Sequence, residues 1–181
     1  MVLVSDATLD DCTAAAARRR CAAERYRPDR VRLLLVAQTP PEELDRYFYF
    51  PSVPKADYLF QAVVPHLLGE VPARLDKRAQ LGRLRDMGVY LNDLKADPCD
   101  PREPAGFVDD LVRRAGSVRP ERAVLIKVDV YDAAFHRLCR AGVPVIDKRM
   151  PFPSTGRQRE FSRGFADALA LAGWASLAEP C

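Results

Sequence analysis

The sequence has few of the residues and motifs that mark several large classes of protein. Among its 181 residues are two histidines, one tryptophan and nine glycines. It contains neither a G-x-G-x-x-G fingerprint nor a P-loop motif, so it lacks the phosphate-binding loops that those motifs form. No run of about 18 apolar residues occurs, and residues 1–11 lack the basic start and apolar stretch of a secretion signal. We therefore expect neither a membrane-spanning helix nor a secretion signal.

Its cysteines are too scattered to indicate a metal centre. No C-x-x-C pair occurs, and the first two cysteines are nine positions apart. Zinc sites and iron–sulfur clusters normally use closely spaced cysteines. The sequence therefore predicts structural thiols in a reducing cytoplasm, with no metal and no other cofactor. The five cysteines are Cys12, Cys21, Cys99, Cys139 and Cys181.

Composition indicates a globular protein whose mildly basic charge is compatible with binding of nucleic acid. The chain is 48% hydrophobic and 29% charged, with a net charge of +3. Those values and its length predict one domain over residues 1–181. Arginine outnumbers lysine, which suits binding of phosphate groups. A GC-rich genome would give the same bias, so composition alone does not decide between these readings.

Short apolar runs alternate with segments of helical spacing along the chain. The runs are apolar throughout, as in strands that are buried on both faces of a parallel sheet. Alternation of this kind predicts a three-layer α/β/α sandwich around a four-stranded parallel sheet. The expected strands are Val31–Ala37, Val89–Leu94, Ala123–Val128 and Val143–Ile146. The expected helices lie at Thr8–Tyr26, Ala56–Leu68, 75–87, 107–115, 130–141 and 161–172.

Three polar segments follow the expected strands. They are Gln38–Pro41, Asn92–Asp93 and Phe152–Thr155. In parallel sheets, ligands bind outside the carboxyl ends of the strands. The proline- and aromatic-rich stretch 38–55 is also longer than most loops, and long loops are often functional. We therefore expect these segments to converge on a site.

The same segments resemble three motifs of the uracil-DNA glycosylase superfamily. VAQTPPEELDRYFYFPS (Val36–Ser52) is similar to its first motif and the aromatic stretch that follows. GVYLNDLKADP (Gly88–Pro98) resembles its second strand, and PFPSTGRQREF (Pro151–Phe161) resembles its His-Pro-Ser loop. The motifs occur in the family's order. The resemblance implies a uracil-DNA glycosylase-like fold and extraction of a base from the DNA stack into a pocket.

The resemblance assigns recognition of the base to Asn92 and stacking to an aromatic residue. An amide offers one acceptor and one donor side by side, which matches one edge of uracil. Phe50 is the closest match for the stacking residue, with Phe48 and Tyr47 as rivals. Without the resemblance, Asn92 would be a capping residue at a strand end, and the aromatics would be core residues.

Two departures from the family's pattern affect catalysis. The acid of the first motif is replaced by Thr39, beside Gln38, and the histidine that steadies the departing base is replaced by Phe152. Loss of one such donor typically slows a reaction by about 10²–10³-fold. We therefore expect weak or lost activity. A displaced carboxylate, from Glu42, Glu43 or Asp45, could replace the missing acid, although solvated charges are the simpler interpretation.

The third motif is also the candidate DNA-binding surface. Ser154, Thr155, Arg157 and Arg159 can contact backbone phosphates, which position a protein without reading sequence. An ordinary helix start would use the same residues.

The leading hypothesis is a cytoplasmic monomer that excises uracil or another deaminated base from single- or double-stranded DNA. A non-catalytic nucleic-acid or nucleobase binder on the same fold is the alternative. An unrelated α/β protein with another partner is the third reading.

Overall fold

The computed structural model describes residues 6–69, 76–102 and 104–175. Over these residues the chain forms six helices and an open sheet of three parallel strands, in the order β2-β1-β3. The α/β class expected from the sequence is confirmed. The helices are α1 (Asp6–Arg25), α2 (Tyr58–Leu68), α3 (Lys77–Asp86), α4 (Pro104–Val118), α5 (Val128–Arg140) and α6 (Gln158–Leu171). The strands are β1 (Leu33–Ala37), β2 (Val89–Asp93) and β3 (Arg122–Leu125).

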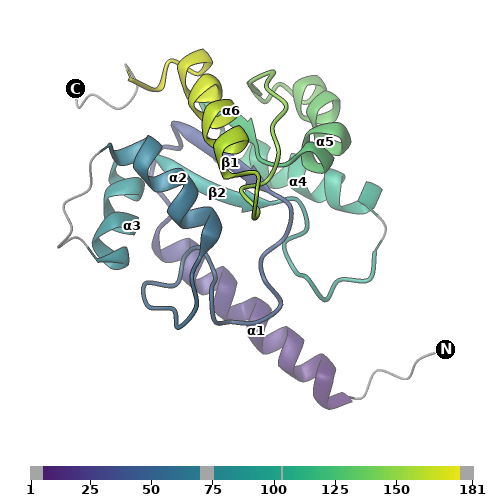
Figure 1. The fold of residues 1–181 in the computed structure, drawn as a ribbon. Coiled ribbons are helices and arrows are strands. Elements are labelled where there is room, and N and C mark those ends of the chain that lie inside the picture. The colour runs from purple at the N-terminus through teal and green to yellow at the C-terminus, as the bar shows by residue number, and fades with distance from the viewer. Residues whose placement is uncertain (1–5, 70–75, 103, 176–181) are drawn as a thin grey trace.

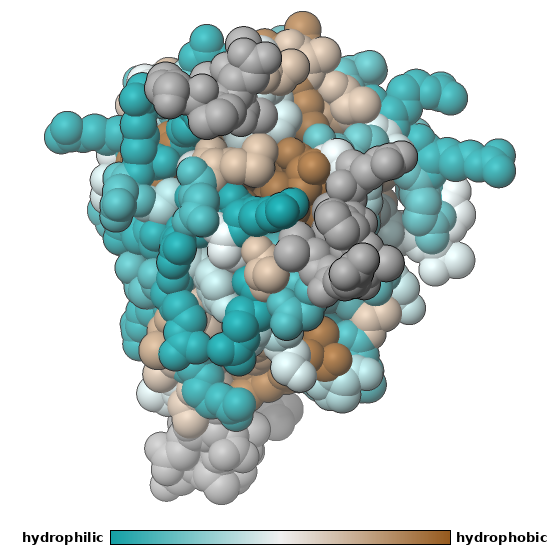
Figure 2. All heavy atoms as spheres, turned by 90° about the vertical axis from the view of Figure 1, so that its left-hand side faces the viewer, coloured by the Kyte–Doolittle hydropathy of each residue, from teal (hydrophilic) through white to brown (hydrophobic). Residues whose placement is uncertain are grey.

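The helices lie on both sides of the sheet (Figure 1). Among the helices, α2 packs against α6 and α3, and α4 packs against α5. A cavity between α1, α4 and β2 places α1 beside α4. This arrangement is compatible with a three-layer sandwich. The side of the molecule at the left of Figure 1 carries mainly hydrophilic side chains, with small apolar patches between them (Figure 2).

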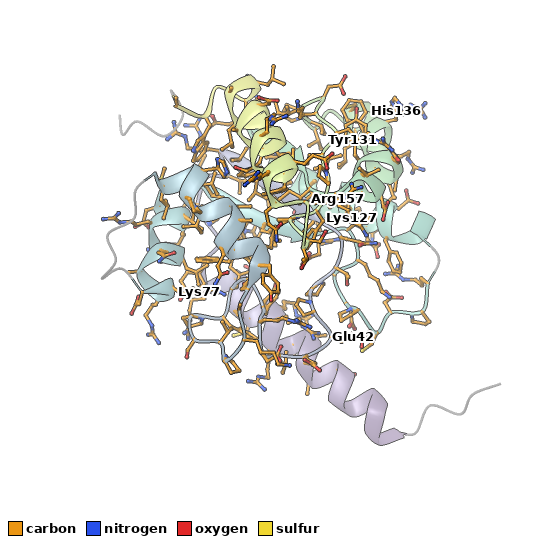
Figure 3. All side chains as sticks on the ribbon, viewed as in Figure 1. Glu42, Lys77, Lys127, Tyr131, His136 and Arg157 are labelled. Atoms are coloured by element: carbon orange, nitrogen blue, oxygen red, sulfur yellow. The ribbon has the colours of Figure 1, made fainter. Side chains whose placement is uncertain are left out.

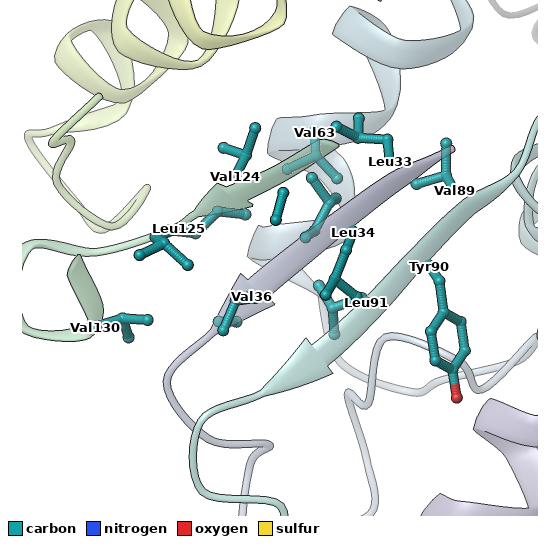
Figure 4. Packing of buried hydrophobic residues seen from close by; sticks show 14 of the residues in the cluster. Leu33, Leu34, Val36, Val63, Val89, Tyr90, Leu91, Val124, Leu125 and Val130 are labelled. Carbon is teal, nitrogen blue, oxygen red and sulfur yellow. The ribbon is translucent and has the colours of Figure 1, made fainter. Parts of the chain in front are cut away.

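The central strand explains why the core forms where it does. All five residues of β1 are buried, because β2 and β3 cover its edges and helices cover both faces. Leu33 is paired with Val89 on one side and with Arg122 on the other. Figure 4 shows Leu34 and Val36 of this strand among the apolar side chains of its neighbours. A run of five apolar residues can satisfy both faces only at such a central position.

The expected fourth strand is reduced to a single bridge. Val145 pairs with Ala123, and its neighbours supply the two hydrogen bonds. Ala123 N–H donates to Pro144 O over 2.9 Å, and Ile146 N–H donates to Ala123 O over 2.8 Å. Proline has no N–H to extend the ladder, so pairing does not propagate through Pro144. Within the described residues the sheet therefore has three strands, and the four-stranded sheet is not confirmed.

The aromatic loop, which we define as Tyr47–Phe50, closes the outer edge of β2. Tyr49 is 2% exposed, and its hydroxyl donates to Leu91 O over 3.1 Å and accepts from Leu91 N over 2.6 Å. One side chain therefore satisfies both backbone groups of a residue whose outer side has no neighbouring strand among the described residues. Tyr47 and Phe48 are buried beside it. This contact anchors the loop next to the end of the sheet.

Cys99 is disulfide-bonded, so the expectation of thiols was wrong for that residue. Cys21 and Cys139 are free and exposed. In the part of the chain that the structure describes, none of the helices has the length and apolar character needed to span a bilayer.

Candidate functional site

A cleft of about 530 Å³ lies at the carboxyl ends of the three strands. Its walls come from the loop after β1, the aromatic loop, the start of α2 and the ends of β2 and β3. Lys127 and Glu42 both line it, and Figure 3 shows the two residues well apart. This is the position at which α/β proteins generally bind their ligands.

Polar residues from three neighbouring strand ends meet in this cleft. Gln38 follows β1, Asp93 ends β2 and Lys127 follows β3, and all three line the cavity. Backbone hydrogen bonds continue the sheet to this point. Lys95 N–H donates to Gln38 O over 2.8 Å, and Ile126 N–H donates to Val36 O over 2.8 Å. The backbones that carry the three polar groups are therefore held by the rigid sheet.

The amide of Gln38 is held by Lys127. Lys127 Nζ donates to Gln38 Oε1 over 2.5 Å and contacts Asp129 Oδ2 at 2.8 Å. Because an ammonium group can only donate, this contact assigns the oxygen and the nitrogen of the amide. None of the described residues bonds the Gln38 nitrogen, so this nitrogen and one oxygen lone pair can face a ligand.

Lys127 adopts a backbone conformation that is rare for a residue with a side chain. Its φ is +91° and its ψ is 138°. Such conformations cost about 1–3 kcal/mol and occur where surrounding structure imposes them, often at functional sites. Lys127 has this conformation at the junction of β3 and α5, from which its ammonium group reaches Gln38.

Asp93 is a buried carboxylate on the cleft wall. It is 8% exposed, and burial raises its pKa to about 7, against the opposing effect of Arg114 and Arg19. Arg114 Nη2 donates to the backbone oxygen of Asp93 over 2.8 Å. A carboxyl group that titrates near neutral pH in a cleft is a candidate for proton transfer.

Arg19 connects α1 to the cleft loop. It is 3% exposed, and its Nη2 donates to Pro41 O over 2.7 Å and to Glu42 O. Its Nε and Nη1 have no hydrogen-bond partner among the described residues. Burial of the guanidinium group lowers its pKa. The loop after β1 is thus fixed by a buried cation from a distant helix.

Aromatic side chains border the same space. Phe48 lines the cleft, but its ring packs edge-on against Phe60 and Tyr49, with centroids 5.2 and 5.1 Å away. Tyr58 and Phe152 also line it, and Tyr58 is 62% exposed. These two rings are the more accessible stacking surfaces.

No family model and no curated protein matches this chain.

The structure brings some of the expected site residues together and separates others. Gln38, Thr39, Phe48 and Phe152 line the cleft. Asn92 lines a second cavity of about 420 Å³, with Arg19 and Arg114. Asp93 lines both cavities, whereas Asn92 lines the second one and not the cleft. The role of Asn92 in reading a base stays a prediction.

The remaining expected residues, apart from Glu42, lie outside the cleft lining. Phe50 packs against Tyr47, with ring centroids 5.1 Å apart. Of the candidate displaced carboxylates, Glu43 and Asp45 contact Lys55 at 2.9 and 2.5 Å, whereas Glu42 lines the cleft. The expected DNA-binding residues are exposed side chains before and at the start of α6; they are Ser154, Thr155, Arg157 and Arg159.

Sequence analysis missed Asp93 and Lys127 as site residues. Asp93 stood beside the favoured Asn92, and the structure shows that Asp93 is the one that lines the cleft. Lys127 lay inside an expected strand, and no sequence pattern indicates its positive φ. Within the described ranges, no group of three or more histidine, cysteine, aspartate or glutamate side chains is placed to hold a metal ion.

Proposed function

We propose that the cleft binds an extruded nucleobase, and that the protein is a uracil-DNA glycosylase-like protein that slowly excises uracil or another deaminated base from DNA. The observation that carries this proposal is the fixed amide of Gln38, held by Lys127 at the strand ends of an aromatic-bordered cleft. Lys127 thus gives Gln38 the fixed orientation that base discrimination requires.

The free groups of the amide match one edge of uracil. The Gln38 nitrogen can donate to a uracil carbonyl oxygen, and the remaining lone pair of Oε1 can accept from the ring N3–H. Cytosine presents a lone pair at N3, so the same amide leaves groups unpaired. Sites that hydrogen-bond a ligand strongly reject analogues that cannot make those bonds. Tyr58 or Phe152 would supply the stacking face.

The residues that replace the family's two catalytic groups support slow excision. Thr39 and Phe152 line the cleft and correspond to the family's acid and histidine, and neither can carry a charge. Catalysis needs interactions that strengthen as charge develops on the departing base. Base binding and stacking by themselves give little of that response.

The exposed arginines before α6 and in its first turn give the proposal a DNA-contacting surface. Phe152 lines the cleft, and Arg157 and Arg159 follow it within a few residues as exposed side chains. A DNA strand that inserts a base into the cleft would bring its phosphate groups to this segment. Such contacts would make binding sensitive to salt.

A second candidate function is binding without excision. It is favoured by Phe152, which has no donor to stabilise a departing base. Such a protein would recognise uracil-containing DNA or a free nucleobase through the same amide.

The decisive experiment measures single-turnover excision and binding on uracil- and hypoxanthine-containing DNA. The substrates are single- and double-stranded, and the variants are Gln38→Ala and Asn92→Ala. Gln61→Ala is the matched control, because Gln61 is an exposed amide on α2 outside the cleft. We expect slow excision of uracil by the unmodified protein, abolished in Gln38→Ala and retained in the control.

The other outcomes are equally informative. Uracil-dependent binding without excision would favour the second candidate. Loss of activity in Asn92→Ala, with Gln38→Ala unchanged, would transfer base recognition to Asn92. Neither binding nor excision by the unmodified protein would refute the proposal.

A further inference from the structure

Three carboxylates line the cleft in the described part of the chain: Glu42, Asp57 and Asp93. Glu42 is exposed. Asp57 is already engaged, because it accepts from the N–H of Phe60 at the start of α2 and from Lys77 Nζ over 2.9 Å. Asp93 is the carboxylate that is both buried and placed at a strand end.

The backbone of Asp93 is held both by the sheet and by Arg114. It is paired with Ala37 in the sheet, and Leu94 N–H after it donates to Ala37 O over 2.7 Å. Arg114 Nη2 binds the backbone oxygens of Asp93 and Leu94 at 2.8 and 3.1 Å. A proton-transfer group needs this kind of positioning, because small displacements slow the reaction strongly.

We propose that Asp93 is the acid–base group of the cleft and replaces the acid missing at Thr39. This inference rests on the proposed base excision. The carboxylate takes a proton from a water molecule as the water oxygen bonds to C1′ of the extruded nucleotide. The bond from C1′ to N1 of uracil breaks, and its electron pair leaves with the base. Asp93 then returns the proton to the uracil anion, so water is the only other reactant consumed.

Charged and titratable groups from α1, α4, the aromatic loop and the residue before α2 act on Asp93. Arg19 of α1 and Arg114 of α4 lower its pKa, whereas Asp57 before α2 raises it. Tyr47 of the aromatic loop interacts with it as well. Burial is the largest influence and raises the pKa of Asp93 to about 7. A base is most effective when its pKa lies near the working pH, and Asp93 meets that condition.

The test compares Asp93→Asn with a control carboxylate on the surface. Asparagine has the shape of the carboxyl group and cannot take up a proton. Asp86→Asn is the control, because Asp86 is an exposed carboxylate outside the cleft that contacts Arg85. Single-turnover excision of uracil from single-stranded DNA is measured from pH 5 to 9, together with binding of the same DNA. Thermal melting checks that each variant folds.

The unmodified protein and the control should show a rate that rises through about pH 7, because the base form of Asp93 is the ionised one. Asp93→Asn should lose about 10²-fold or more in rate and lose the pH dependence, with DNA binding nearly unchanged. Carboxyl-carbon NMR should show one signal that titrates near neutral pH and is missing in Asp93→Asn.

Three results would overturn the assignment. One is an Asp93→Asn variant with the rate and pH profile of the unmodified protein. Another is titration of the Asp93 signal in the ordinary carboxyl range. The third is an unmodified protein that binds uracil-containing DNA without excising the base, which would overturn the role of Asp93 and leave base binding standing. Absence of both binding and excision would instead remove the proposed function as a whole.

Discussion

The backbone strain at Lys127 predicts an inverted ranking of two substitutions. At most positions alanine is more stable than glycine, because glycine loses more backbone freedom on folding, by about 0.5–1 kcal/mol. At Lys127, φ is +91°, a conformation that glycine adopts readily and alanine does not. Lys127→Gly should therefore be more stable than Lys127→Ala.

The magnitude follows from the terms that differ between the two variants. Both lose the hydrogen bond to Gln38 and the ion pair with Asp129, so these terms cancel in the comparison. Alanine retains a strain of about 1–3 kcal/mol that glycine relieves. After the entropic cost of glycine, the difference is about 1 kcal/mol in favour of Lys127→Gly. That difference raises Tm by about 2–4 °C in a protein of this size.

The assay is thermal and urea unfolding followed by circular dichroism. The matched control is the pair Gln61→Gly and Gln61→Ala, at an exposed position within α2. There alanine should be the more stable residue, by about 1 kcal/mol. Equal stability of the two Lys127 variants, or greater stability of the alanine variant, would refute the strain. Both Lys127 variants should lose discrimination between uracil and cytosine, because either one frees the Gln38 amide to rotate.

Three further predictions concern the sheet edge, the buried acid and the DNA surface. Tyr49→Phe should lower the free energy of unfolding by about 1–3 kcal/mol, measured in urea, because it leaves both backbone groups of Leu91 unpaired. The pKa of Asp93 is raised from 3.8 to about 7, so its contribution to stability is complete below pH 3.8 and is lost as pH rises through 7. Melting curves should therefore show Asp93→Asn gaining stability relative to the unmodified protein between pH 4 and 8. Replacing Arg157 and Arg159 by alanine should weaken DNA binding and lower its salt slope by about one for each phosphate group that the variant no longer neutralises, measured by fluorescence anisotropy.

The fold was predictable because its strongest signals are local. The run from Leu33 to Ala37 is apolar at every position, and a sheet can bury such a run only if it is central and covered on both faces. The fourth strand was wrong in extent because its run, Val143–Ile146, is interrupted at its second residue. Pro144 accepts a hydrogen bond from Ala123 but cannot donate one, and the ladder stops after one bridge.

The strands were easy to predict because they are apolar on both faces. The same property made the site hard to predict. In β2 the residues before Asn92 are buried on both faces, so the pattern carries no alternation that tells which face turns toward the cleft. The sequence therefore does not show that Asp93 lines the cleft and that Asn92 does not. Gln38 was recognised from its place after an apolar strand, whereas its partner Lys127 is 89 residues away in the sequence. Such a contact exists only once the sheet order is known.

The buried Arg19 explains how the cleft can be both shaped and charged by one residue outside it. Its Nη2 binds the backbone oxygens of Pro41 and Glu42, and this fixes the loop that carries Gln38 and Thr39. Its charge also opposes the effect of burial on Asp93. Without that charge the pKa of Asp93 would rise further, and less of the carboxylate would be ionised at neutral pH. A buried cation with two unpaired nitrogens is costly to fold. The roles proposed for Gln38 and Asp93 both depend on these two effects of Arg19, which would give the cost a functional reason.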